Sequence, residues 1–73
     1  MTTERQAIRM VREGRYVAEV VVTLTETDHE WSPLLSAQDV QKLDEVRSAL
    51  RRGDVNAATK LGRVFELTPV AAE

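Results

Sequence analysis

The stretch WSPLLSAQDVQKLDEVRSALRRGD, residues 31–54, decides the fold, because it holds the longest helix and lies between two strand-like segments. Ser36 is placed to cap the helix amino terminus, and Asp39 stands three residues on, where a side chain can reach back to the cap amide. Pro33 keeps the residue before it extended, so the helix cannot begin much earlier. Gly53 suits the left-handed residue beyond a helix end. The sequence therefore predicts a helix between Ser36 and Gly53.

This helix has one apolar stripe. Its acidic residues lie in the early turns and its arginines in the last turn, which complements the helix dipole. The residue nearest the middle of the stripe, Leu43, is expected to contribute most to stability. The helix should bury one face, because its apolar residues recur at helical spacing and its polar residues take the opposite side: Val40, Leu43, Val46 and Leu50 against Gln38, Gln41, Lys42, Glu45 and Ser48.

Two strand-like segments precede the helix, at residues 4–12 and 15–26, and the second is dense in β-branched residues. A three-residue loop, Glu13-Gly14-Arg15, is predicted between them, with Gly14 or Arg15 at positive φ, because it separates apolar from polar faces. The predicted core face is Ile8, Met10, Ala18, Val20, Val22 and Leu24, and the outer face is Arg9, Val11, Val17, Glu19, Val21 and Thr23.

The remainder of the chain predicts a second helix at residues 55–61, capped by Asp54 and ended by Gly62, and a strand at residues 63–68 ended by Pro69. The fold class is α+β, ββααβ, with a three-stranded antiparallel sheet and two helices packed on one face. The last strand is expected beside the first, in the spatial order 2-1-3. An alternative is a hairpin exchanged between subunits. Residues 1–73 are expected to form a single small domain with frayed ends at about 1–3 and 71–73.

Composition bounds the class of protein. With 73 residues, 42% hydrophobic and 30% charged, the chain is typical of a small soluble globular domain with a marginal core. A net charge of −2 and a pI near 5.4 give no overall attraction to nucleic acid or to an anionic membrane. The chain has no cysteine and no apolar run long enough for a membrane span or signal-peptide core, so we expect a cytoplasmic protein.

One cluster has the chemistry of a metal site or an acid/base pair: Asp28, His29 and Glu30, with Glu26 close by. A single histidine without a second at ligand spacing favours a solvated loop instead. No serine, threonine or lysine has a partner that the sequence identifies as its base. We therefore predict no catalytic, metal or cofactor site, and no enzyme.

The densest basic group suggests nucleic-acid binding as an alternative, because two helices joined at Gly53 superficially resemble a helix-turn-helix. The acidic pI, the long first helix and the missing third helix count against it. Cations at helix ends that stabilise the dipole are the better account. The residues of this alternative site are Arg47, Arg51, Arg52, Lys60 and Arg63.

The run GRYVAEV, residues 14–20, resembles the early strand of HicB-type antitoxins, small bacterial proteins that bind and neutralise a partner toxin. The chain departs from that family after Val22, where the family's Pro-rich, Gly-containing turn is absent, and it has no separate DNA-binding tail. With WSPLLS, KLDEVRSALRRGD and RVFELTPV, the run also looks like short uncharacterised bacterial proteins with a GxYVAEV strand. The resemblance implies a protein-binding role and assigns no functional residue.

These observations predict a small protein-interaction module that binds a partner protein, and the resemblance implies that it is bacterial and antitoxin-like. The alternative is a nucleic-acid-binding or autoregulatory protein. A homodimer is expected through the second strand, which the order 2-1-3 places at the sheet edge. Trp31 either covers the open end of the small core or is a further candidate contact, since tryptophan is enriched at binding hot spots. The predicted partner-binding residues are Val17, Glu19, Val21 and Trp31.

Overall fold

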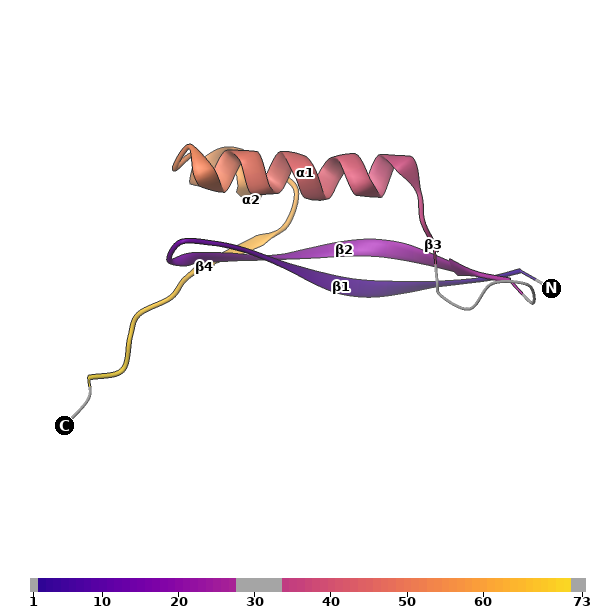
Figure 1. Ribbon diagram of the computed structural model, residues 1–73, viewed down its shortest axis with the longest axis horizontal. Coiled ribbons are helices and arrows are strands. Elements are labelled where there is room, and N and C mark those ends of the chain that lie inside the picture. Colours follow the sequence, from indigo (N-terminus) through magenta and orange to yellow (C-terminus); the bar gives the residue numbers. More distant parts are fainter. Residues whose placement is uncertain (1, 28–33, 72–73) are drawn as a thin grey trace.

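The computed structural model describes residues 2–27 and 34–71. Strands come first, two helices follow, and a last strand returns to the sheet (Figure 1), so the predicted α+β class and element order are confirmed. One short strand, at residues 34–35, was not predicted. The elements are β1 (Thr3–Glu13), β2 (Tyr16–Glu26), β3 (Leu34–Leu35), α1 (Ala37–Arg51), α2 (Val55–Thr59) and β4 (Arg63–Glu66).

The strand β2 lies at the centre of the sheet. β1 pairs with it antiparallel along its whole length on one side, while β3 and β4 share the other side at opposite ends. The predicted order 2-1-3 is therefore wrong, because β4 pairs with β2 and not with β1. A close backbone approach allows this pairing: a Cβ on Gly62 would lie 2.5 Å from the carbonyl oxygen of Glu19.

The hairpin turn has two residues, Gly14 and Arg15, and not the predicted three. Gly14 has a φ of 60° and no non-glycine residue of the described chain has a positive φ, which is the pattern of a type II′ turn. Glu13 consequently pairs with Tyr16, and Ile8 with Val21. The register differs by one residue from the predicted one, so every β1 side chain lies on the opposite face.

The core lies between β2 and the helices. The inward residues of β2 are those predicted, but β1 contributes Val11 and the half-buried Ala7, while Ile8 and Met10 face away. Along α1 the buried stripe is centred on Val46 and not on Leu43. The buried residues of this core are Val11, Ala18, Val20, Val22, Leu24, Val46, Ala49, Leu50 and Ala58. Val17 is also buried, but its side chain lies on the other side of the sheet.

The amino-terminal part of the α1 stripe is less buried than predicted: Leu43 is half-buried and Val40 is 46% exposed. Both side chains line a groove beside Arg9 and Leu35, over the β1 side of the sheet. Arg9 is the residue opposite Val20, where the predicted register placed Ile8, and an arginine offers α1 less apolar surface than an isoleucine. The one-residue change in β1 therefore also reduces the burial of α1.

Side chains of α1 cover the part of the β2 edge that lies between β3 and β4. The Thr23 amide donates to Asp39 Oδ2 at 2.8 Å, and Lys42 Nζ donates to the Val21 carbonyl at 2.7 Å. Ser36 caps the helix as predicted, accepting from the Asp39 amide at 3.1 Å. The Asp39 carboxylate, expected to bond the cap amide, instead bonds the sheet and anchors α1 to β2.

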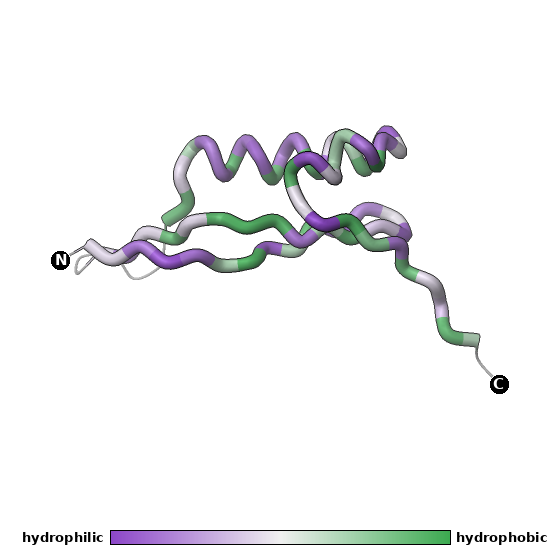
Figure 2. Tube along the Cα trace, turned by 180° about the vertical axis from the view of Figure 1, so that it is seen from behind, coloured by the Kyte–Doolittle hydropathy of each residue, from purple (hydrophilic) through white to green (hydrophobic). Residues whose placement is uncertain are grey.

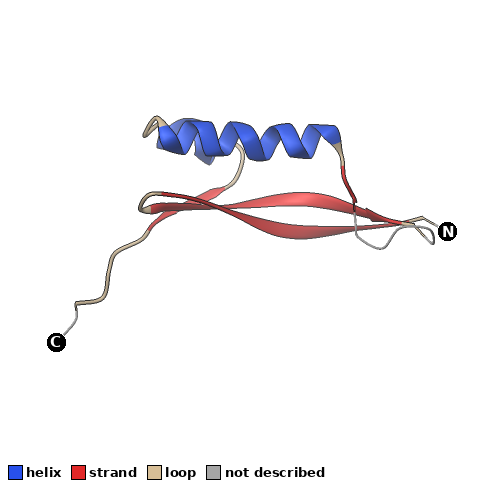
Figure 3. Ribbon diagram, viewed as in Figure 1, coloured by secondary structure: helices blue, strands red, loops and turns tan. Residues whose placement is uncertain are grey.

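The molecule has two layers. Both helices lie on the same side of the sheet in Figure 1 and Figure 3, and no described helix or strand covers the other side. In the hydropathy view of Figure 2 the middle of β2 is continuously hydrophobic, whereas β1 alternates with strongly polar positions. In the described part of the chain, the sheet thus has one face packed on helices and one face without a covering layer.

Candidate interaction surface

The uncovered side of the sheet, termed here the open face, is formed by alternate residues of three strands. Val17, Glu19 and Val21 of β2 point away from the helices, because Ala18, Val20 and Val22 between them are buried under α1 and α2. The pairing register places residues of β1 and β4 beside them. The open face comprises Gln6, Ile8, Met10, Arg12, Val17, Glu19, Val21, Thr23, Arg63 and Phe65.

Large apolar side chains are exposed on this face. Ile8 is 58% exposed, Met10 61%, Val21 48% and Phe65 39%. Ile8 lies directly opposite Val21, and Phe65 opposite Val17, which is 8% exposed between its neighbours. Single exposed apolar residues are ordinary, but several on one face form a patch of the kind that marks interaction sites.

Charged groups accompany the patch. The Arg63 guanidinium carbon lies 5.3 Å from the centre of the Phe65 ring, a cation–π distance. Glu19 stands between Met10 and Arg63 in the register, and Arg12 is opposite Val17. The face therefore combines an apolar patch with cations and an anion in reach of a bound surface.

Three of the four predicted partner-binding residues, Val17, Glu19 and Val21, lie together on the open face. Trp31 lies outside the described residues. Sequence reasoning missed Ile8 and Met10, which the one-residue register error assigned to the core. The missed signal is Gly14 at the first position of a Gly14–Arg15 loop, the favoured chemistry of a two-residue type II′ turn.

Phe65 was also missed. The sequence pattern separates Phe65 from Val64 by strand alternation, but it does not show which of the two meets the core. The structure pairs Phe65 with Val17 on the open face, while Val64 packs against the core opposite Ala18. Pairing with β2, which the predicted strand order excluded, decides this assignment.

The predicted basic group is divided between places. Arg47 and Arg51 approach Glu13 at 3.6 Å and 3.0 Å, and Arg52 approaches Asp54 at 3.5 Å. Arg52 and Lys60 both border a groove between the two helices, whereas Arg63 lies on the open face. Arg63 is thus separated by the sheet from the four cations of the helix layer, and three of those four have carboxylate partners.

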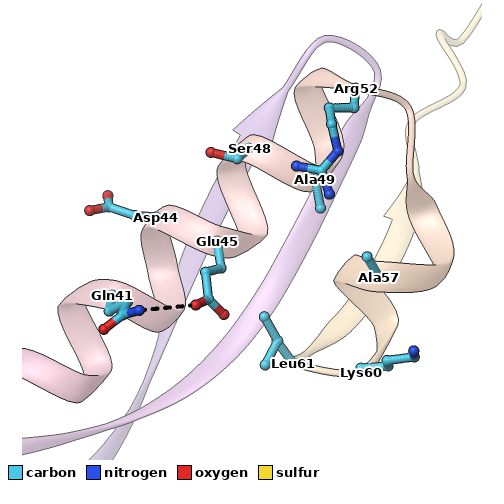
Figure 4. Close-up of a pocket in the computed structure, with 9 residues that line it drawn as sticks. All are labelled: Gln41, Asp44, Glu45, Ser48, Ala49, Arg52, Ala57, Lys60 and Leu61. Atoms are coloured by element: carbon cyan, nitrogen blue, oxygen red, sulfur yellow. Dashed lines mark hydrogen bonds between the residues drawn. The ribbon is translucent and has the colours of Figure 1, made fainter.

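The groove between α1 and α2 mixes charges with apolar side chains (Figure 4). Gln41 Nε2 donates to Glu45 Oε1 at 3.2 Å at one end, and Leu61 points into the space between the helices. In the same view Asp44 and Ser48 point away from α2. The lining residues, which include no paired nucleophile and base, are Gln41, Asp44, Glu45, Ser48, Ala49, Arg52, Ala57, Lys60 and Leu61.

The cluster Asp28, His29 and Glu30 lies outside the described residues. Within residues 2–27 and 34–71, no group of three or more acidic, histidine or cysteine side chains is placed to hold a metal ion. No described helix is long and apolar enough to cross a membrane.

Comparison of the chain with protein-family models, with curated proteins and with solved structures finds no match. The composition and exposure of the open face are therefore what indicate a function.

Proposed function

We propose that this protein is an interaction module that binds a partner protein through the open face. The observation that carries the proposal is the exposure of Ile8, Met10, Val21 and Phe65 on one side of a sheet whose other side is packed against helices. An antiparallel sheet with one solvated face ordinarily carries polar side chains there. Apolar residues at these positions reduce solubility unless another surface covers them.

The residue types on the open face are those that protein interfaces use. Aromatic residues, methionine and arginine are enriched at interfaces relative to the remaining surface. Phe65, Met10 and Arg63 supply one of each within neighbouring rows of the sheet. A partner of matching chemistry has an apolar patch that meets Met10 and Phe65, and a carboxylate within reach of Arg63.

The antitoxin-like character of this module follows from the resemblance of residues 14–20 to HicB-type antitoxins. That run includes Val17 and Glu19, which belong to the open face. A module of this class acts by covering the working surface of a small partner protein, and needs no catalytic group of its own. The proposed role is therefore masking by surface contact.

A pair of matched valine substitutions tests the proposal. Val21 is 48% exposed on the open face and Val40 is 46% exposed on α1, in the helix layer. The wild type, Val21→Lys and Val40→Lys are each used to capture proteins from the native cell, and specific partners are identified by mass spectrometry. A partner of the open face is retained by wild type and Val40→Lys, and its affinity falls at least tenfold with Val21→Lys, as expected for a charge placed in an apolar contact.

Two results would overturn this proposal. One is a purified partner that binds Val21→Lys and the wild type equally well. The other is salt-sensitive binding of duplex DNA at low ionic strength, lost when Arg51 and Arg52 are replaced and unaffected by Val21→Lys. The second result would establish the nucleic-acid alternative.

A further inference from the structure

The outer edge of β1 carries backbone groups that are not used by the described sheet. On β2, the Thr23 amide and the Val21 carbonyl bond α1, so these residues direct their backbone groups away from β1. Their β1 partners are Gln6 and Ile8. In an antiparallel pair such positions are the non-hydrogen-bonded ones, so Gln6 and Ile8 direct their own amides and carbonyls to the free edge.

Because backbone groups point alternately to the two sides of a strand, the same argument applies to the other residues of β1. The even-numbered residues of β1, from Glu4 to Arg12, present unpaired amides and carbonyls, and their side chains lie toward the open face. Among the described residues no strand pairs with this side of β1. The eleven pairs with β2 run without a bulge, and the strand contains no proline. Such an edge is a template for another strand.

The charged side chains of β1 favour one register for pairing with a second copy of the strand. Antiparallel pairing of β1 with its own copy must match even residues with even residues, since these carry the free groups. Centred on Ile8, this pairing sets Glu4 opposite Arg12 of the second copy, and Gln6 opposite Met10 of the second copy. Both Glu4–Arg12 contacts of the two-fold pair then join opposite charges, which stabilises a cross-strand pair.

The neighbouring registers match charges less well. A centre on Ala7 sets Arg5 opposite Arg9 of the second copy. A centre on Arg9 sets that arginine opposite its own copy, and the Glu13 that it sets opposite Arg5 is already paired with Arg47 and Arg51. Like charges directly opposite each other destabilise a strand pair. The charges on β1 therefore disfavour the neighbouring registers and favour the one centred on Ile8.

We infer that two copies of this chain form a homodimer by antiparallel pairing of their β1 strands about Ile8. The two-fold axis stands perpendicular to the sheet, so both helix layers lie on one side and both open faces on the other. Ile8 and Met10 of the two copies then meet at the centre of a larger apolar surface. The dimer is closed, because the other edge of β2 is already occupied by β3, β4 and the side chains of α1.

This inference goes beyond the proposed function and fails separately from it. Pairing through the β1 edge leaves Val21 and Phe65 exposed, so the dimer can still bind a partner. It also replaces the homodimer expected through the second strand, since β2 is central in the sheet and has no free edge of that length.

Reversal of the two charges tests the register. Glu4→Arg and Arg12→Glu are made singly and together, and self-association is measured by analytical ultracentrifugation at micromolar concentration. The wild type is expected to have the mass of two 8.2 kDa chains. Each single variant creates two like-charge contacts and should weaken the dimer about tenfold, while the double variant restores opposite pairing and dissociates within about threefold of wild type.

Substitutions at Gln6 test the edge independently of charge. Gln6→Pro removes an amide that points to the free edge, so the monomer keeps its β1–β2 ladder while the dimer loses backbone bonds. Gln6→Ala keeps the amide and serves as the control. Circular dichroism and thermal unfolding report whether each variant is folded.

The expected result is dimeric Gln6→Ala and a folded, monomeric Gln6→Pro. A wild type that sediments as a single 8.2 kDa chain at micromolar concentration would overturn the inference. So would a dimer that is unchanged by Gln6→Pro, or one that the double charge reversal fails to restore.

Discussion

Val20, Val21 and Val22 are three consecutive valines of one strand, yet their exposed fractions are 0%, 48% and 1%. Strand alternation turns the outer two toward the helices and the middle one toward the open face. The same residue type therefore stabilises the fold on one face and offers a contact surface on the other. The difference shows that a high density of β-branched residues predicts where a strand lies. The position of the helix layer decides which of its side chains are buried in the core and which are exposed.

The two faces also differ in how they are held. On the covered face, β2 is joined to the helices by apolar burial and by contacts of Asp39 and Lys42 with its backbone, and its edge is approached closely by Gly62. On the open face, the described side chains contact residues of the same or the adjacent strand, such as Arg63 over the Phe65 ring. Substitutions should therefore cost much more free energy of unfolding on the covered face.

The largest difference is expected for an aspartate at adjacent valines. Val22→Asp places an unpaired carboxylate in the core and should lower the free energy of unfolding by about 3 to 5 kcal/mol, enough to unfold much of a small domain. Val21→Asp should cost less than about 1 kcal/mol, since the side chain meets solvent. Urea denaturation followed by circular dichroism measures both. Equal losses would show that the open face is covered in solution.

The next effect concerns the contact that holds β4 to β2. Gly62→Ala places a Cβ against the Glu19 carbonyl, and the backbone must shift because that oxygen belongs to a central strand. The expected cost is about 1 to 3 kcal/mol, with faster amide exchange in β4. Asn56→Ala, at an exposed position of α2, is the control and should change stability by less than about 0.5 kcal/mol. Unchanged exchange in β4 would contradict the close approach.

A smaller loss is expected where α1 covers the β2 edge. Asp39→Ala leaves the part-buried Thr23 amide without its acceptor and should cost roughly 1 to 2 kcal/mol. Asp44→Ala removes an exposed carboxylate from the same helix and should have little effect. Thermal unfolding compares the two. Equal stability of the two variants would show that water replaces the Asp39 carboxylate without cost.

The smallest effect belongs to the ion pairs around Glu13. Arg51→Ala removes a 3.0 Å pair whose arginine is 65% exposed, so the expected cost is below about 1 kcal/mol. Arg47 remains near Glu13 and limits the loss further. The difference from wild type should decrease when unfolding is repeated at high salt, because salt screens exposed charges. A cost that does not depend on salt would point to packing of the arginine stem instead.

Much of the local structure was predictable. Ser36 caps α1, Asp54 caps α2, and Gly53 has a φ of 76° past the helix end. The inward and outward residues of β2 are as predicted, since alternation in a β-branched strand is strong evidence. Of the candidate site, Val17, Glu19 and Val21 are on the open face, while Trp31 lies outside the described residues.

The remaining features depend on segments that are distant in the sequence. Ile8 and Met10 were assigned to the core because apolar residues were matched across the hairpin, but the turn at Gly14 imposes another register. Asp39 was assigned to the helix cap, but the Thr23 amide competes for the same carboxylate. The short pairing of Leu34 and Leu35 with β2 gives no pattern long enough to detect.

The sequence by itself determined where both helices begin, the position of β2 and the identity of its two faces, because caps, turn residues and alternation act over a few neighbouring residues. The second helix ends at Thr59, two residues before the predicted Leu61. Only the tertiary structure decided the face of β1, the partner of β4 and the exposure of Ile8, Met10 and Phe65. These depend on hairpin register and on the approach of Gly62 to Glu19, contacts whose free energy is gained only when distant segments pack together. The open face and the free edge of β1 are products of that packing.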